Sequence, residues 1–183
     1  MFTEFLNIIV RSLKLDNTLY KDKKNFSDSA IYFASLIVIL TIIIQTIPNN
    51  TYINWMSEYG LWQKGMLKFR ETLLWGLFFW LLKSLYFYFV GKVVFPNKKV
   101  TFSFVKILTI TGFAHAPLIF NFLAFNKALL YILFFTFIWY IASQTVAINV
   151  IFDYKNKLKS FLIVIAPLLV FFLSSIFYIS AII

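Results

Sequence analysis

Five long runs of apolar residues constrain the fold of this 183-residue chain more than any other feature. Each run is close to the roughly 20 apolar residues that a helix needs to cross a bilayer core. Backbone groups in lipid must be hydrogen-bonded within the protein, and the runs lack the alternation of barrel strands. The sequence therefore predicts an all-α integral membrane protein, a bundle of five transmembrane helices. The predicted spans are about 30–47, 72–95, 104–125, 128–152 and 161–183.

Positive charges are distributed unevenly between the segments that connect these runs. If the N-terminus is cytoplasmic, twelve Lys and Arg residues lie on the inner side and four on the outer side. The inner residues are Arg11, Lys14, Lys21, Lys23, Lys24, Lys92, Lys98, Lys99, Lys106, Lys155, Lys157 and Lys159, and the outer ones are Lys64, Lys68, Arg70 and Lys127. Because cytoplasmic loops are enriched in positive charge, we expect a cytoplasmic N-terminus and an extracytoplasmic C-terminus.

The composition narrows the classes of partner. The chain is 61% hydrophobic, has a net charge of +10 and contains no cysteine. Basic residues that lie between apolar runs indicate membrane orientation and contact with anionic headgroups, so the lipid bilayer is the expected partner and nucleic acid is not. Disulfides, iron–sulfur clusters and thiolate zinc sites are excluded.

The first residues form an amphipathic pattern. One helical face carries polar and charged residues, and the opposite face carries apolar ones. The polar set is Glu4, Asn7, Arg11 and Lys14, and the apolar set is Phe2, Phe5, Leu6, Ile9 and Leu13. We expect residues 1–29 to form a cytoplasmic N-terminal segment with a helix lying in the interface, ahead of a five-helix membrane domain at 30–183. Such a helix anchors the protein or recognises a partner.

A second amphipathic pattern lies between the first two runs. Trp55, Tyr59, Trp62, Met66 and Phe69 recur at spacings of three and four. This spacing is typical of one face of a helix. Two interpretations stay open, an interfacial helix or a backward extension of the second span.

Two ionisable side chains, Lys83 and His115, lie inside predicted spans, where a buried charge is costly and often functional. Each is near the middle of its span, and a short connection joins the two antiparallel spans. We therefore expect the two side chains to lie at the same depth and to be able to meet. No carboxylate lies near them within a span, which argues against an ion-coupled pump. A structural contact and a ligand site are both open interpretations.

The segment ITGFAHAPLIF, residues 110–120, is predicted to be a kinked and closely packed helix. Gly112 and Ala116 are four residues apart, a spacing that lets another helix approach closely. Pro117 has no N–H, so the carbonyl of Phe113 loses its helical donor. In lipid this carbonyl needs another donor, and the two ionisable side chains are the expected candidates. Four amides are expected to bond between helices: Gln45, Asn121, Gln144 and Asn149.

Enzymatic chemistry finds little support in the sequence. One histidine, no cysteine and no carboxylate within a span leave too few ligands for a zinc or di-iron site. Neither a nucleophile elbow nor a phosphate-binding or dinucleotide-binding glycine motif is present. We therefore expect a protein that is not an enzyme, without catalytic residues, cofactor or metal.

Several segments together resemble bacterial members of the Yip (Ypt-interacting protein) family of five-span membrane proteins. These are EFLNIIVRSLKLDNTLYKDKK before the first span, VTFSFVKILTITGFAHAPLIF in the third, and the basic turn DYKNKLKS before the fifth. The specific part is a Gly-aromatic-Ala-x-x-Pro pattern, matched by Gly112, Phe113, Ala114 and Pro117. The resemblance implies an integral membrane protein with a cytoplasmic N-terminus, and in a bacterium it implies the inner membrane.

Eukaryotic relatives in that family bind Rab-type GTPases in vesicle traffic. This chain lacks their long cytosolic N-terminal region and their Asp-Leu-Tyr-Gly-Pro-like motif, so a GTPase partner is not expected.

Two functional hypotheses follow. The first is a membrane-organising, trafficking-like or scaffold protein of Yip type that acts through helix and interface contacts, with a protein partner or a second copy of itself. The alternative is a small transporter or channel subunit with a midplane polar site at Lys83 and His115. The candidate functional or packing residues are Lys83, Gly112, Phe113, His115, Ala116 and Pro117.

Overall fold

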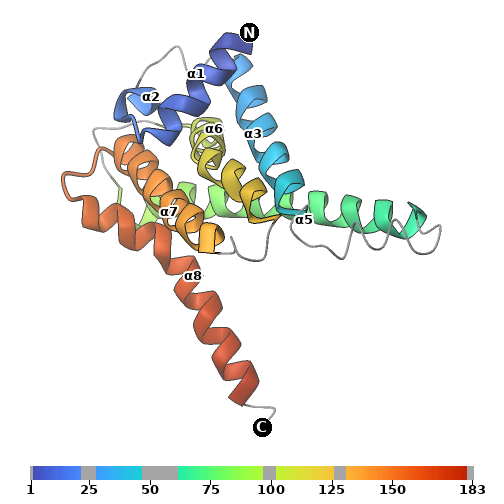
Figure 1. The fold of residues 1–183 in the computed structure, drawn as a ribbon. Helices are drawn as coiled ribbons and strands as arrows, with labels where there is room; N and C mark the ends of the chain where they lie inside the picture. Colours follow the sequence, from blue (N-terminus) through green and yellow to red (C-terminus); the bar gives the residue numbers. More distant parts are fainter. Residues whose placement is uncertain (1, 22–27, 47–61, 97–101, 126–130, 181–183) are drawn as a thin grey trace.

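The computed structural model describes residues 2–21, 28–46, 62–96, 102–125 and 131–180 (Figure 1). Within these ranges the chain is helical and contains no strand, which confirms the predicted all-α class for this part of the chain. The elements are α1 (Phe2–Leu13), α2 (Asn17–Lys21), α3 (Asp28–Thr46), α5 (Trp62–Phe89), the π-helical η2 (Val90–Val94), α6 (Phe104–Phe113), the 3₁₀-helical η3 (Ala116–Phe125), α7 (Tyr131–Phe152) and α8 (Lys157–Ser180).

Among the described residues, three helical segments are long and apolar enough to cross a membrane. They are Arg70–Val94, Phe104–Leu123 and Tyr131–Phe152, and they correspond to the second, third and fourth predicted spans. The apolar part of α3, Ser29–Gln45, is shorter. The chain therefore has the character of a membrane protein, whereas spans at 30–47 and 161–183 remain predictions.

Helix α5 starts well before the predicted second span. It begins at Trp62 and continues through η2 to Val94. Of the two interpretations of the aromatic pattern, the backward extension is therefore correct from Trp62 onward, while Trp55 and Tyr59 lie outside the described residues. Figure 1 shows the N-terminal part of α5 and the C-terminal part of α8 extending away from the other helices.

The core forms where α3 crosses α6. A Cβ atom placed on Gly112 would lie 2.7 Å from Ala34 Cβ and 3.1 Å from Ala34 Cα and O, so only glycine allows the two backbones this separation. Ile37 from α3 and Ile110 from α6 are completely buried at this contact region. The predicted close approach of a helix at Gly112 is confirmed, and Ala34 is the residue it meets.

The third predicted span is not one continuous α-helix. α6 ends at Phe113, a turn follows at Ala114 and His115, and η3 begins at Ala116. Pro117 therefore occupies the first turn of the 3₁₀ helix, where its missing N–H costs no helical bond. The expected kink exists, and it takes the form of a change from α-helix to 3₁₀-helix.

The donor to the freed carbonyl of Phe113 is Ser12, and neither Lys83 nor His115 takes that role. Ser12 Oγ donates to Phe113 O at 2.7 Å. It also lies 3.3 Å from the hydroxyl of Tyr20, which lies 3.3 Å from Ser143 Oγ on α7. The expectation for the donor was wrong because α1 packs across the break between α6 and η3, a contact that nothing in the local sequence indicates. Burial raises the pKa of the Tyr20 hydroxyl, so it remains a neutral donor in this chain of hydroxyls.

The turn between α1 and α2 is held by one carboxylate. Asp16 accepts bonds from Thr18 Oγ1 at 2.7 Å, from Thr18 N at 2.8 Å and from Arg11 Nε at 2.9 Å. These bonds favour the charged carboxylate and lower the pKa of Asp16 from 3.8 to about 2. The bond from the Thr18 hydroxyl has the largest effect, and the bond from Arg11 the second largest. The amphipathic segment thus forms a helical hairpin, α1–α2, that docks on the other helices.

Helix α1 divides its apolar residues between two surroundings. The apolar Ile8 is buried against the other helices, as is the polar Ser12, whereas the apolar Phe2, Leu6 and Val10 are exposed. The structure has a helix at Phe2–Leu13, whereas its predicted place in the membrane interface remains a prediction.

Candidate functional site

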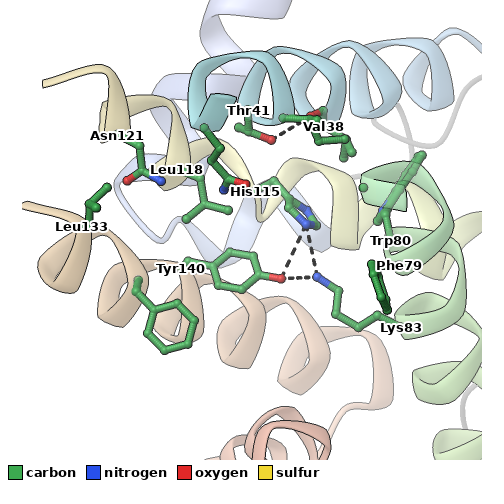
Figure 2. A pocket seen from close by; sticks show the side chains of 14 residues that line it. Val38, Thr41, Phe79, Trp80, Lys83, His115, Leu118, Asn121, Leu133 and Tyr140 are labelled. Carbon is green, nitrogen blue, oxygen red and sulfur yellow. Dashed lines mark hydrogen bonds between the residues drawn. The ribbon is translucent and has the colours of Figure 1, made fainter. Parts of the chain in front are cut away.

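Lys83 and His115 meet in the structure. Lys83 projects from the last third of α5, His115 lies in the turn between α6 and η3, and Lys83 Nζ lies 3.2 Å from His115 Nε2 (Figure 2). The expectation that these two side chains can meet is therefore confirmed. Their contact joins side chain to side chain and leaves the freed backbone carbonyl to Ser12.

A third polar side chain, Tyr140 of α7, completes the cluster. Lys83 Nζ donates to the hydroxyl of Tyr140, and this hydroxyl lies 3.5 Å from His115 Nε2. The rings of His115 and Tyr140 are 5.1 Å apart, and Lys83 Nζ lies 4.8 Å from the centroid of the Tyr140 ring. The sequence reading missed Tyr140 because it lies in a span rich in aromatic residues. Its place four residues before Gln144, on the same helical face, was the available signal.

The hydrogen bonds around His115 determine which of its nitrogen atoms carries the proton. His115 Nδ1 lies 2.7 Å from the carbonyl oxygen of Thr111, which can only accept. Nδ1 therefore carries the hydrogen. In the neutral ring Nε2 is then an acceptor, and it faces the donors Lys83 and Tyr140.

Thr111 connects this cluster to three helices. Its carbonyl oxygen also accepts Gln144 Nε2 at 3.1 Å. Its hydroxyl oxygen accepts Trp80 Nε1 at 3.1 Å and lies 2.7 Å from Ser84 Oγ, both on α5. These bonds link α5, α6 and α7 directly behind His115, so they fix the ring in position.

The three polar side chains line a cavity of about 410 Å³ between α3, α5, η3 and α7 (Figure 2). This volume lies in the range of about 300–1,000 Å³ that is usual for small-molecule sites. Thr41, Gln45 and Asn121 add polar groups to the lining, and most of the remaining lining residues are apolar. None of the lining residues that the structure describes is Asp or Glu.

The other predicted site residues support the cavity from behind. Gly112, Phe113, Ala116 and Pro117 are buried, and none of them lines the cavity. They form the break that turns His115 toward Lys83, so their role in the structure is packing. Three of the four predicted amides bond between elements: Asn121 accepts from Thr136, Gln144 bonds Thr111, and Asn149 accepts from Ser160 at 3.0 Å.

Chemically, the cluster combines hydrogen-bond donors with one cation and no anion. Lys83 can donate three hydrogen bonds, of which His115 and Tyr140 accept two. Within the described ranges no group of three His, Cys, Asp or Glu side chains could hold a metal ion. The arrangement can bind a group that accepts hydrogen bonds and carries negative charge.

Comparison of the chain with family models, with curated proteins and with solved structures finds no match.

Proposed function

We propose that this chain is a non-enzymatic membrane protein of five spans that binds a small molecule near the bilayer midplane, as a small transporter or channel subunit. The observation that carries the proposal is the cavity of about 410 Å³ lined by Lys83, His115 and Tyr140. In the proposed arrangement α3 and α8 are the first and fifth spans. The N-terminus is cytoplasmic, and a bacterial inner membrane is the proposed location.

The cost of placing Lys83 within an apolar helix supports a functional role. A lysine in a membrane span is unfavourable by about 2.5–3.5 kcal/mol at the helix centre on insertion scales. Replacing buried ion pairs and polar groups by apolar residues of similar volume is often neutral or stabilising. If Lys83 only held two helices together, an apolar residue could therefore take its place without loss of stability. Its position at a cavity favours a role in binding a ligand.

The test is the double substitution Lys83→Leu and His115→Phe. We expect the variant to insert normally and to lose the activity of the protein in cells, read as loss of rescue of the deletion phenotype or of substrate uptake. The matched control is Lys92→Leu, because Lys92 is exposed near the end of the same helix and contacts Tyr88 outside the cavity. Normal function of the double variant would contradict the proposal.

A second candidate function is the Yip-like scaffold or membrane-organising role. The exposed residues Phe2, Leu6 and Val10 on α1 favour it, because they form an apolar stripe at i, i+4 and i+8 that a partner or a membrane surface could cover. Substitution of all three by serine separates the two functions. It should abolish a scaffold role and leave ligand binding in the cavity intact.

A further inference from the structure

The cavity between α3, α5, η3 and α7 also indicates what kind of molecule it binds. We propose that the ligand is an amphiphile with one anionic head group, a carboxylate or a phosphate, and a single alkyl chain. The head group lies beside Lys83 and Tyr140, and the chain lies against the apolar walls. This inference rests on the proposed function and specifies its substrate class.

The first reason is charge. The ion pair between Arg11 and Asp16 involves no residue that lines the cavity. Lys83 has instead two neutral neighbours, Tyr140 and His115, and no described residue of the lining carries a carboxylate. A cation in a span normally has a partner of opposite charge. An anionic ligand supplies that partner.

The second reason is the direction of the available hydrogen bonds. His115 uses Nδ1 on Thr111, so its remaining nitrogen only accepts. Lys83 therefore keeps one N–H after its bonds to His115 and Tyr140. The lone pair of His115 Nε2 is taken by Lys83 Nζ at 3.2 Å, which lies nearer than the Tyr140 hydroxyl at 3.5 Å, so the hydroxyl hydrogen of Tyr140 is also available. Two donors in one corner suit the oxygen atoms of a carboxylate or a phosphate.

The third reason is the nature of the other walls. Beside the polar groups of Thr41, Gln45 and Asn121, apolar side chains from all four surrounding elements line the cavity: Val38, Ile42, Phe79, Leu118, Leu133 and Phe137. A cavity of about 410 Å³ holds roughly 13 water-sized groups at about 30 Å³ each. A methylene is about the size of a water molecule, so one chain of about ten carbons with a small head group matches this volume.

The fourth reason is the position of the opening. The cavity is partly open, and its exposed lining residues include the rings of Phe79 on α5, at 58%, and Phe137 on α7, at 44%. Both rings lie inside the apolar segments Arg70–Val94 and Tyr131–Phe152, away from the segment ends. In the described part of the chain the opening thus faces the hydrocarbon layer, where an amphiphile is dissolved and a water-soluble anion is not.

Equilibrium binding to the full chain in phosphatidylcholine nanodiscs tests this assignment. The probes are decanoate, decyl phosphate, decanol, decyltrimethylammonium and inorganic phosphate. We expect the two anionic amphiphiles to bind at least about tenfold more tightly than decanol, because hydrogen bonds to charged groups are the stronger ones. The tighter of the two anions identifies the head group. Equal binding of decanol and decanoate would overturn the assignment, and so would binding of inorganic phosphate as tightly as decyl phosphate.

Variants locate the bound molecule. Lys83→Met should weaken decanoate binding at least about tenfold and leave decanol unchanged, whereas Lys92→Met should change neither. Leu118→Trp keeps the cation and fills the apolar wall, so it should weaken decanoate and decanol alike. It also provides an independent test if Lys83→Met does not fold. Unchanged decanoate affinity in Leu118→Trp would contradict the placement of the chain.

The outcomes separate this inference from the proposed function. If decanol or decyltrimethylammonium binds as tightly as decanoate and this binding is weakened by Leu118→Trp, the cavity is a ligand site and the anionic class is wrong. If no probe shows binding that depends on Lys83 or Leu118, the ligand site itself is wrong, and the proposed function fails with it.

Discussion

At the scale of single residues, the polar groups inside this apolar chain are matched by partners from distant parts of the sequence. Ser12 satisfies a carbonyl 101 residues away, and Trp80 and Ser84 reach Thr111 across 31 and 27 residues. In the part of the chain that the structure describes, Gln144 Oε1 is the one buried side-chain atom of this kind that lacks a partner. A hydrogen bond of this kind adds little net stability, but a buried polar group that lacks its partner lowers stability by a larger amount.

Ser12→Ala should destabilise the protein. Removal of the hydroxyl leaves the buried carbonyl of Phe113 without a donor and also breaks the contact with Tyr20, and an unsatisfied buried group costs about 1–3 kcal/mol. Unfolding in mild detergent measures the change. Thr3→Ala, at an exposed position on the same helix, is the control and should unfold like the wild type. Equal stability of the two variants would show that another donor replaces Ser12.

Part of the site could be predicted because ionisable residues are rare within the apolar runs of this chain. Lys83 and His115 stand out because the chain has one histidine and few charges within its apolar runs. Tyr140 and Ser12 do not stand out, because tyrosine and serine are common in this chain and neither carries a charge that membrane burial would penalise. Their roles depend on which helices pack together, and no local pattern encodes that.

At the scale of elements, the contact between α3 and α6 depends on the absence of a side chain. Gly112→Ala would place Cβ against the backbone of Ala34, which cannot move without displacing α3. Overpacking of this kind costs about 1–3 kcal/mol. The matched control is Gly76→Ala, whose Cβ would meet only side-chain atoms of Ile42, Cδ1 at 2.5 Å, Cγ1 at 2.7 Å and Cγ2 at 3.3 Å, and a side chain can shift more easily than a backbone. Thermal unfolding should therefore show a larger loss for Gly112→Ala, and the reverse order would contradict the role given to this contact.

The α1–α2 hairpin should lose stability in acid. The pKa of Asp16 is lower in the folded protein, about 2 against 3.8, so the folded state binds the proton less tightly. Its bonds to Thr18 and Arg11 stabilise the hairpin fully above the higher value, and this contribution is lost as the pH falls through the lower one. A titration of the unfolding midpoint should fall more steeply in the wild type than in Asp16→Asn over this interval. Asp153→Asn, at an exposed turn, should follow the wild type, and parallel curves for all three proteins would contradict the assignment.

The elements themselves were largely predictable, and the break in the third one was not. Apolar length located α5, α6–η3 and α7 correctly, because lipid permits few alternatives to a helix. Pro117 indicated a kink near the right place. The change to a 3₁₀-helix over Ala116–Phe125 has no such signal, since it depends on α1 supplying the Ser12 hydroxyl to the freed carbonyl.

At the scale of the whole molecule, the number of spans decides whether the cavity lies at the bilayer midplane. In the ranges that the structure describes, three helical segments meet the length and hydropathy of a span. With α5 and α7 crossing the membrane, Lys83 and Tyr140 lie within the apolar interior on any count of spans. The orientation of the chain, however, depends on α3 and α8, because each additional crossing reverses the side on which the following segment lies.

Reporter fusions after Lys21, Asn97, Asn156 and Ile183 can count these crossings. If α3 and α8 both cross, the first three fusion points are cytoplasmic and the last is extracytoplasmic, in line with the positive charges near the first three points. A fluorescent protein that folds only in the cytoplasm should then be bright at the first three points and dark at Ile183, and an exported alkaline phosphatase should show the opposite pattern. A cytoplasmic signal at Ile183 would mean that α8 does not cross. Opposite signals at Lys21 and Asn97 would mean that only one of α3 and α5 crosses, and the cavity would then no longer lie between spanning helices.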